Sequence, residues 1–237
     1  MTVHSRYTDG SYYLNNPSWD AEHIPSKLSC FSSLCTSIDG FHSVIEVGCG
    51  SGLFIHALAE QNPNLNFIAY DPSPFLDAIW KELPSLNNLQ FHNVSFTPTP
   101  TPNRVLFLLI DILEHIPDPI SFLQSLAQSY PNCSIVTLIP LELSLASLMM
   151  PRSLIHSYKK VGHIHFFSST SARILLSEAG FSTVSSILVS RYRFSSPIGF
   201  ASRISFLARS IVHKVLGPEF LSRLFGGISI MAYLEPS

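Results

Sequence analysis

The sequence predicts an α/β fold in which a mostly parallel sheet carries helices on both of its faces. Three observations lead to this prediction. Apolar, strand-like segments alternate with segments of helical periodicity along most of the chain. A glycine-rich turn joins the first of these strands to the first helix. Within the predicted strand 104–110, every residue after Arg104 is apolar, as expected for a central strand that is covered on both faces.

The glycine-rich turn reads Glu46-Val47-Gly48-Cys49-Gly50-Ser51-Gly52. Glycine at alternate positions permits positive φ and a close approach of the backbone to a ligand, and the following helix N-terminus presents unpaired N–H groups. The dinucleotide-binding pattern G-x-G-x-x-G would require glycine at position 53, where the chain has Leu53. An NAD(P)-dependent reductase is therefore disfavoured. We interpret Cys49 as a small residue that fills the tight turn rather than as a nucleophile, because no base stands beside it.

The second strand, predicted over 65–71, ends in the carboxylate of Asp71. In nucleotide-binding folds a carboxylate at this place accepts hydrogen bonds from the hydroxyls of a ribose. Alternatively, Asp71 caps the following helix, with Pro72 at the first helical position. The two roles are compatible.

The acidic residue followed by G-x-G-x-G, with a second acid at the end of the next strand, resembles the class I S-adenosylmethionine (SAM)-dependent methyltransferases. The resemblance implies a Rossmann-like sheet of seven strands with the last strand antiparallel, and SAM as the cofactor. It also implies a set of cofactor-binding residues: Glu46, Gly48, Cys49, Gly50, Gly52, Asp71, Pro72 and Asp111.

The strand 104–110 is followed by Asp111-Ile112-Leu113-Glu114-His115-Ile116-Pro117-Asp118-Pro119. This segment resembles a motif, D-x-L-E-H-x-x-D-P, of the ubiquinone-biosynthesis-like small-molecule methyltransferases, where it borders the reactive methyl. His115 and Glu114 are accordingly the candidate catalytic residues, since an imidazole with a pKa of about 6.5 can take a proton from a hydroxyl near neutral pH. The alternative is that both residues shape the pocket. Asp118 is expected to cap a helix.

A second histidine-containing segment lies downstream, where His163 and His165 stand two residues apart in a stretch that resembles the family pattern G-H-x-x-x-F-S. We predict that these histidines line the acceptor pocket, with structural hydrogen bonding as the alternative. No cysteine or carboxylate stands at an evident ligand spacing, so no metal is predicted. The chain departs from the family at 93–95, where many relatives carry an acid for adenine, and at 131–133, where relatives have Pro-Gly-Gly.

The chain divides into an N-terminal lid or helical segment at 1–40 and a methyltransferase domain at 41–237 with an insertion at about 195–226. In the first segment, Tyr12 or Tyr13 is a candidate for the lid. The Pro/Thr stretch 97–102 must be a loop. The remaining expected elements are strands at 89–94, 133–139, 181–192 and 227–234 and helices at 21–36, 73–83, 120–130, 141–158 and 169–179.

The composition predicts one well-packed core and an unusually apolar surface. Of 237 residues, 46% are hydrophobic and only 13% are charged, against about 25% charged in an average soluble protein. A net charge of −2 argues against a nucleic-acid partner. The chain has four cysteines without a C-x-x-C pair and no run of 18 apolar residues, so we expect reduced thiols and a cytoplasmic location.

The insertion alternates apolar with basic residues along a helical pattern. Such a segment favours contact with lipid or with a greasy acceptor, and packing against the domain is the alternative. The sequence therefore predicts transfer of a methyl group from SAM, by SN2 displacement, to a small acceptor of lipophilic or aromatic character. Two alternatives remain: a methyltransferase acting on a protein or peptide, and a non-catalytic module that binds a membrane or partner through 195–225.

Overall fold

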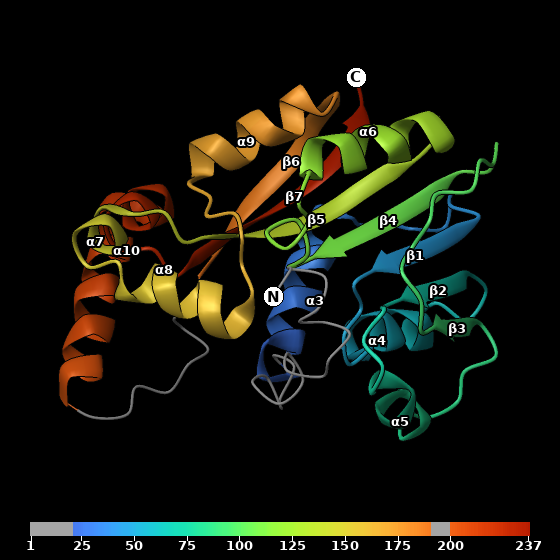
Figure 1. The fold of residues 1–237 in the computed structure, drawn as a ribbon, viewed down its shortest axis with the longest axis horizontal. Helices are drawn as coiled ribbons and strands as arrows, with labels where there is room; N and C mark the ends of the chain where they lie inside the picture. The colour runs from blue at the N-terminus through green and yellow to red at the C-terminus, as the bar shows by residue number, and fades with distance from the viewer. Residues whose placement is uncertain (1–20, 191–199) are drawn as a thin grey trace.

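The computed structural model describes residues 21–190 and 200–237, and within them one sheet of seven strands in the order β3-β2-β1-β4-β5-β7-β6 (Figure 1). The strand β7 runs antiparallel to both of its neighbours, while the strands from β3 to β5 pair in parallel. The predicted α/β fold with an antiparallel last strand is confirmed. The strands are β1 (Ser43–Val47), β2 (Asn66–Tyr70), β3 (Leu89–His92), β4 (Val105–Ile110), β5 (Ser134–Leu141), β6 (Phe181–Ser190) and β7 (Ile228–Pro236).

Helices cover both faces of this sheet. One face packs against α3 (Ile24–Leu34), α4 (Leu53–Gln61) and α5 (Leu76–Lys81). A short 3₁₀ turn, η1 (Ala21–His23), directly precedes α3. The other face packs against α6 (Pro119–Ser129), α9 (Ser169–Glu178) and part of α10 (Phe200–Phe225). Figure 1 shows α6 and α9 side by side above the sheet, while α3 and α4 lie below it.

Burial on both faces explains the continuous apolar run of β4. All six of its side chains are buried, and they alternate between the two cores. The odd-numbered residues pack with α6 and α9, and the even-numbered residues pack with α3 and α4, because successive side chains of a strand point to opposite faces.

Two predicted helix boundaries were wrong. The helix expected at 141–158 is broken: Leu141 still pairs with β7, and two short helices and a π-helical turn follow, α7 (Leu145–Met149), α8 (Arg152–His156) and η2 (Ser157–Val161). A capping box of Ser144 and Ser147 starts α7, and Pro151 separates it from α8. Pro72 is not the first helical residue either, because α5 begins only at Leu76.

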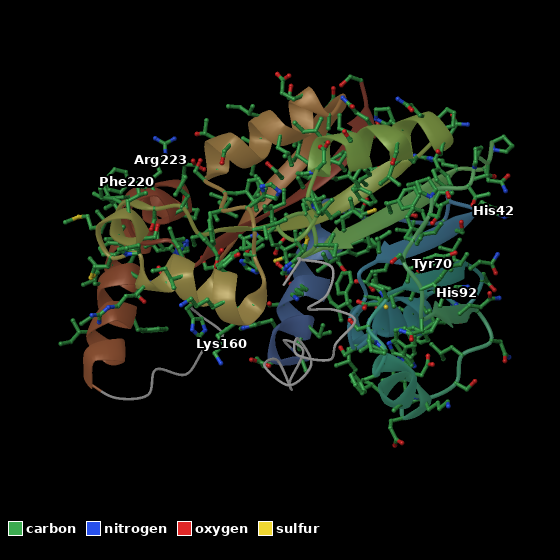
Figure 2. All side chains as sticks on the ribbon, viewed as in Figure 1. His42, Tyr70, His92, Lys160, Phe220 and Arg223 are labelled. Atoms are coloured by element: carbon green, nitrogen blue, oxygen red, sulfur yellow. The ribbon has the colours of Figure 1, made fainter. Side chains whose placement is uncertain are left out.

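The Pro/Thr stretch is a loop, as predicted, and it stands where a helix would otherwise link β3 to β4. It is tied to the end of α6 by two hydrogen bonds: Thr101 N donates to Ser129 O (3.2 Å) and Thr99 N to the Tyr130 hydroxyl (3.1 Å). A cavity of about 410 Å³ lies beside this loop and reaches the amino ends of β1 and β2. Tyr70 lines it, on the side of the molecule where Figure 2 also labels His42 and His92.

The predicted apolar and basic segment forms α10, which bends at Gly217 (φ 82°), just before Pro218. Its inner side reaches the core through Phe206, Val212 and Leu221. Part of this segment therefore packs against the domain, which was the alternative interpretation. Among the described residues, no helix combines the length and the apolar character needed to span a bilayer. Residues 1–20, with Tyr12 and Tyr13, lie outside the described ranges.

Candidate functional site

The loop between β1 and α4 requires glycine at its alternate positions. Gly48, Gly50 and Gly52 have φ values of 75°, 51° and 75°, in the left-handed region. A Cβ atom at Gly48 would lie 2.5 Å from Ile112 Cδ1, and one at Gly52 would lie 2.5 Å from Phe91 Cε1. Close packing of Ile112 and Phe91 therefore requires glycine at positions 48 and 52. The loop lies at the carboxyl end of β1, where an open α/β sheet binds its ligands.

Backbone hydrogen bonds hold this loop to β2. The N–H groups of Gly48 and Cys49 both donate to the carbonyl of Tyr70, at 2.8 and 3.1 Å. Burial raises the pKa of Cys49 well above its ordinary value, so the thiol stays protonated and is a poor nucleophile. This result supports the interpretation of Cys49 as a small residue that fills the turn.

Asp71 connects the loop to the end of β2. Its Oδ2 accepts a hydrogen bond from Gly50 N (3.0 Å) and its Oδ1 accepts one from Ser73 N (2.9 Å). Burial raises the pKa of Asp71, and the N–H groups of Ser73 and Gly50 oppose that rise. The Ser73 side chain also bonds to Asp71. Because a carboxylate offers about four acceptor positions, these bonds still leave capacity for a ligand hydroxyl. The bond from Ser73 N closes an Asx-type turn at Asp71. This turn occupies the residues just after β2, so α5 starts later than expected, at Leu76.

Two aromatic residues that sequence reasoning missed complete this region. Trp80 Nε1 donates to the carbonyl of Gly50 (2.9 Å), and its ring stacks on Phe91 with 4.8 Å between centroids. Asn93, at a position where the chain departs from the family, donates to the carbonyls of Asp71 and Ser73 (2.9 and 2.6 Å). A tryptophan on the buried side of a short helix beside a glycine loop was the available signal.

A buried carboxyl group lies next to the loop. The side chain of Glu46 is almost fully buried, and burial raises its pKa to about 8, while Lys27 and the N–H of Ile55 oppose that rise. Lys27 reaches in from α3 and its Nζ lies 2.9 Å from Asp111 Oδ2. Asp111 follows β4 with φ 53°, an uncommon value for a residue with a side chain.

Sequence reasoning placed Asp111 at this edge of the sheet but missed Lys27. The signal was available: on α3 the apolar residues Ile24, Leu28 and Phe31 mark one face, and Lys27 lies on the same face. A lysine on a buried stripe needs a charged partner, and Asp111 provides it.

A second polar cluster lies beyond Asp111, where the ends of β4 and β5 meet the segment after η2. Glu114, His115 and His163 are all buried. Nδ1 of His163 lies 2.7 Å from Glu142 Oε2 and its Nε2 lies 3.8 Å from Glu114 Oε1. Glu142 also accepts a hydrogen bond from the Ser157 hydroxyl (2.5 Å). Sequence reasoning missed Glu142, although it directly follows the fifth strand.

The two buried histidines have opposite pKa shifts. Burial lowers the pKa of His115 to about 4, with a further lowering by the neighbouring charge of His163, so the ring is neutral at pH 7. Burial also lowers the pKa of His163, but the hydrogen bond to Glu142 and the charges of Glu114 and Glu142 outweigh it, and the net shift is upward. Nδ1 of His115 lies 3.2 Å from the carbonyl of Gly162; since a carbonyl only accepts, Nδ1 carries the proton.

His165 lies apart from this cluster. Its Nε2 donates to the carbonyl of Ile116 (2.9 Å), with Pro117 O at 3.3 Å, which is the structural role weighed as an alternative. The backbone N–H groups of Ile164 and His165 also donate to Glu114 O, at 2.9 and 3.2 Å. These bonds fasten the two predicted site segments to each other. Asp118 caps α6 as predicted, with its Oδ1 3.0 Å from Ser121 N.

Comparisons with known proteins identify the family and the fold. A family model described as a methyltransferase domain matches residues 21–186. The sequence is 41% identical over 54 residues to a tRNA (guanine-N(7)-)-methyltransferase of Desulfitobacterium hafniense (strain DSM 10664 / DCB-2). That match covers 23% of this chain and spans about a quarter, 24%, of the curated relative.

Two solved structures share the fold. A chain of the complex between the Haloferax volcanii Trm112 methyltransferase activator and a methyltransferase has a TM-score of 0.65 at 14% identity, covering 100% of this chain and 98% of its own length. The mycolic acid cyclopropane synthase CmaA1, solved with S-adenosylhomocysteine (SAH) and CTAB, has a TM-score of 0.60 at 13% identity, covering 89% and 82%. At these identities the likeness concerns the fold.

Proposed function

The chain belongs to the methyltransferase-domain family, and we propose that it transfers the methyl group of SAM to a small acceptor of lipophilic or aromatic character. SAM is the cofactor of the fold that this chain adopts. The sulfonium supplies a good leaving group, so catalysis by SN2 displacement consists mainly of alignment of the acceptor with the methyl.

The observation that carries this proposal is the glycine loop at the carboxyl end of β1, which is hydrogen-bonded to Asp71 through Gly50 N. Positive φ at Gly48, Gly50 and Gly52 gives the loop a backbone conformation that residues with side chains rarely adopt. Asp71 retains acceptor capacity for a ribose hydroxyl. We assign cofactor contacts to the full predicted set: Glu46, Gly48, Cys49, Gly50, Gly52, Asp71, Pro72 and Asp111.

The acceptor is assigned to the cluster at the ends of β4 and β5. His115 is neutral at pH 7 and carries its proton on Nδ1, so Nε2 presents a lone pair. This state suits assistance in the deprotonation of an acceptor hydroxyl. Glu114 and His163 line the same cluster, while His165 acts by fixing the loop at Ile116.

An exposed apolar surface supports a lipophilic acceptor and a peripheral contact with membranes. On α10 the side chains of Ile204, Leu207, Ile211 and Val215 are 53–71% exposed and follow helical spacing. The neighbouring α7 adds a second exposed group, Leu145, Leu148, Met149 and Met150. Basic side chains occur in the same elements or nearby; Figure 2 labels Lys160 in η2 and Arg223 on α10. Apolar and basic residues in this combination are typical of helices that lie in a membrane interface.

The first test is isothermal titration of the purified protein with SAM and SAH, with NADH as the control ligand. We expect micromolar binding of both adenosyl ligands and none of NADH. Gly50→Arg, which fills the turn, and Asp71→Ala, which removes the acceptor of Gly50 N, should each abolish binding. Binding that persists in both variants would contradict the assignment of this site.

Methyl transfer is then measured with labelled SAM and a panel of acceptors beginning with polyprenyl phenols. The alternative function, a non-catalytic module, would show vesicle binding without SAM binding. Flotation with phosphatidylcholine vesicles, with and without phosphatidylserine, tests the surface. Leu207→Glu together with Val215→Glu should prevent flotation and leave the melting temperature unchanged, because both side chains are exposed. The matched control, Lys214→Glu, changes charge alone.

A further inference from the structure

The buried cluster of Glu114, His115, His163 and Glu142 is unusual because four ionisable side chains from three separate segments meet there. Glu114 is fully buried, and His115 and His163 are 7% and 6% exposed. Burial of carboxylates and imidazoles is costly unless each group gains a strong partner. The backbone hydrogen bonds between these segments, such as that from Ile164 N to Glu114 O, would form with any side chains at these positions. They therefore do not explain why ionisable side chains are buried here.

Both imidazoles are oriented through the same ring atom. Nδ1 of His115 donates to the carbonyl of Gly162, and Nδ1 of His163 lies 2.7 Å from the carboxylate of Glu142. In each neutral ring the lone pair is then on Nε2. Histidines that bind metals show this arrangement, in which a carbonyl or carboxylate holds one ring nitrogen and the other nitrogen faces the metal.

The ligand atoms converge. One ligand atom from each of Glu114, His115 and His163 lies within 4.8 Å of the other two. The His163 Nε2 to Glu114 Oε1 distance, 3.8 Å, exceeds a hydrogen bond and leaves space between the two atoms. The rings of the two histidines stand at 74° with 4.8 Å between centroids, so their edges can point to a common centre.

We propose that Glu114, His115 and His163 bind one divalent transition-metal ion, with Glu142 and the carbonyl of Gly162 orienting the two imidazoles. Two imidazoles and one carboxylate form the donor set of mononuclear sites that keep open positions, with Zn²⁺, Mn²⁺ and Co²⁺ as suitable ions. The inference revises the sequence-based expectation of no metal. Spacing along the chain does not suggest this site, because Glu114 and His163 stand 49 residues apart.

The role of the ion rests on the proposed function, because the ion would act on the methyl acceptor. An open coordination position takes the acceptor hydroxyl oxygen, and the ion supplies Lewis acidity that lowers the pKa of that hydroxyl. The hydroxyl proton is released to water. The oxygen forms the new O–CH₃ bond as the S–CH₃ bond of SAM breaks, and neutral SAH leaves. In this arrangement the Nε2 lone pair of His115 would bind the ion, so the ion would promote deprotonation in place of His115 acting as a base.

Metal binding is measured directly on the full chain. Protein stripped with a chelator is titrated separately with Zn²⁺, Mn²⁺ and Co²⁺, and its bound metal is counted by mass spectrometry after dialysis. We expect one equivalent for at least one ion. His115→Gln and His163→Gln should each weaken binding by about 100-fold or more, and Glu142→Gln by about 10- to 100-fold. His156→Gln, at an exposed histidine next to Ser157, is the matched control and should bind as the wild type does.

SAH titration of every variant separates this inference from the proposed function. Variants that lose metal but still bind SAH retain the fold and support the metal site. Wild-type protein that binds SAH but none of the three ions overturns the metal site alone. One equivalent of metal that persists in the doubly substituted H115Q/H163Q protein also overturns it. Metal bound with one equivalent by a protein that binds neither SAM nor SAH supports the site and contradicts methyl transfer.

Discussion

The two halves of the candidate site are built in different ways. The cofactor half, at the ends of β1 and β2, is held by bonds to the backbone, as with the carbonyl of Tyr70 and the N–H of Gly50. The acceptor half, at the ends of β4 and β5, is held by side chains that meet from distant segments, as with Glu142 and His163. A site made of backbone needs particular residue types at fixed spacings, whereas a site made of side chains needs only that the fold bring them together.

The strongest test of the cofactor half is Gly52→Val. The new side chain would meet Phe91, 2.5 Å from its Cβ position, in a backbone with φ 75°. We expect SAH affinity to fall by at least about 100-fold, or about 2.7 kcal/mol, in calorimetry. Gly180→Val is the control, because Gly180 has φ 85° but no atom within 4 Å of a Cβ. If both variants lose SAH affinity equally, the cause is backbone strain at positive φ and not the contact with Phe91.

Lys27→Met tests the link between the two halves. It leaves Asp111 in a mostly buried place without the ammonium that lies 2.9 Å away. We expect a loss of unfolding free energy of about 3 kcal/mol in urea titrations, because removal of one member of a buried pair leaves an uncompensated charge. Lys81→Met, at an exposed lysine of α5, should change stability little. The double substitution Lys27→Met with Asp111→Asn should recover part of the loss; no recovery would show that the pair itself contributes nothing.

Glu46→Gln tests the buried carboxyl of the cofactor half through pH. The pKa of Glu46 rises from 4.5 to about 8 on folding, so between these values the native state binds more protons than the unfolded state. The stabilisation of protonated Glu46 is complete below pH 4.5 and is lost as the pH rises through about 8. Wild-type stability should therefore fall by up to about 1.4 kcal/mol per pH unit in that interval.

The glutamine variant should lack this slope in urea titrations at pH 5.5, 6.5 and 7.5. Glu60→Gln, at an exposed glutamate of α4, should keep the wild-type slope. The charges that face Glu46 are those of Lys27 and Asp71. A slope that survives in Glu46→Gln would assign the proton uptake to another group.

The smallest effect is expected for His165→Ala in the acceptor half. The loss of the hydrogen bond to Ile116 O should lower the unfolding free energy by about 1 kcal/mol. SAH affinity should not change, since His165 contacts none of the cofactor residues described above. His156→Ala, an exposed histidine, is the control for thermal melts. A drop in SAH affinity would show that the two halves are coupled through this loop.

Much of the cofactor half was predictable from the sequence. The spacing of Gly48, Gly50 and Gly52 predicted a turn with positive φ, and all three residues have positive φ in the structure. Asp71 was expected beside that turn and bonds to Gly50. The prediction of a helix at 141–158 was wrong because this stretch begins with the end of a buried strand, at Leu141. Periodicity does not separate a strand from a helix in a short apolar run.

The sequence by itself determined the order of strands and helices, the glycine loop and the acid at the end of β2, because these depend on local backbone geometry and on apolar periodicity. Only the tertiary structure decided that Lys27 meets Asp111 and that His163 joins Glu114, His115 and Glu142. Those contacts join segments far apart in the chain, and their energies depend on burial and on distances of a few ångströms, which no spacing along the sequence encodes.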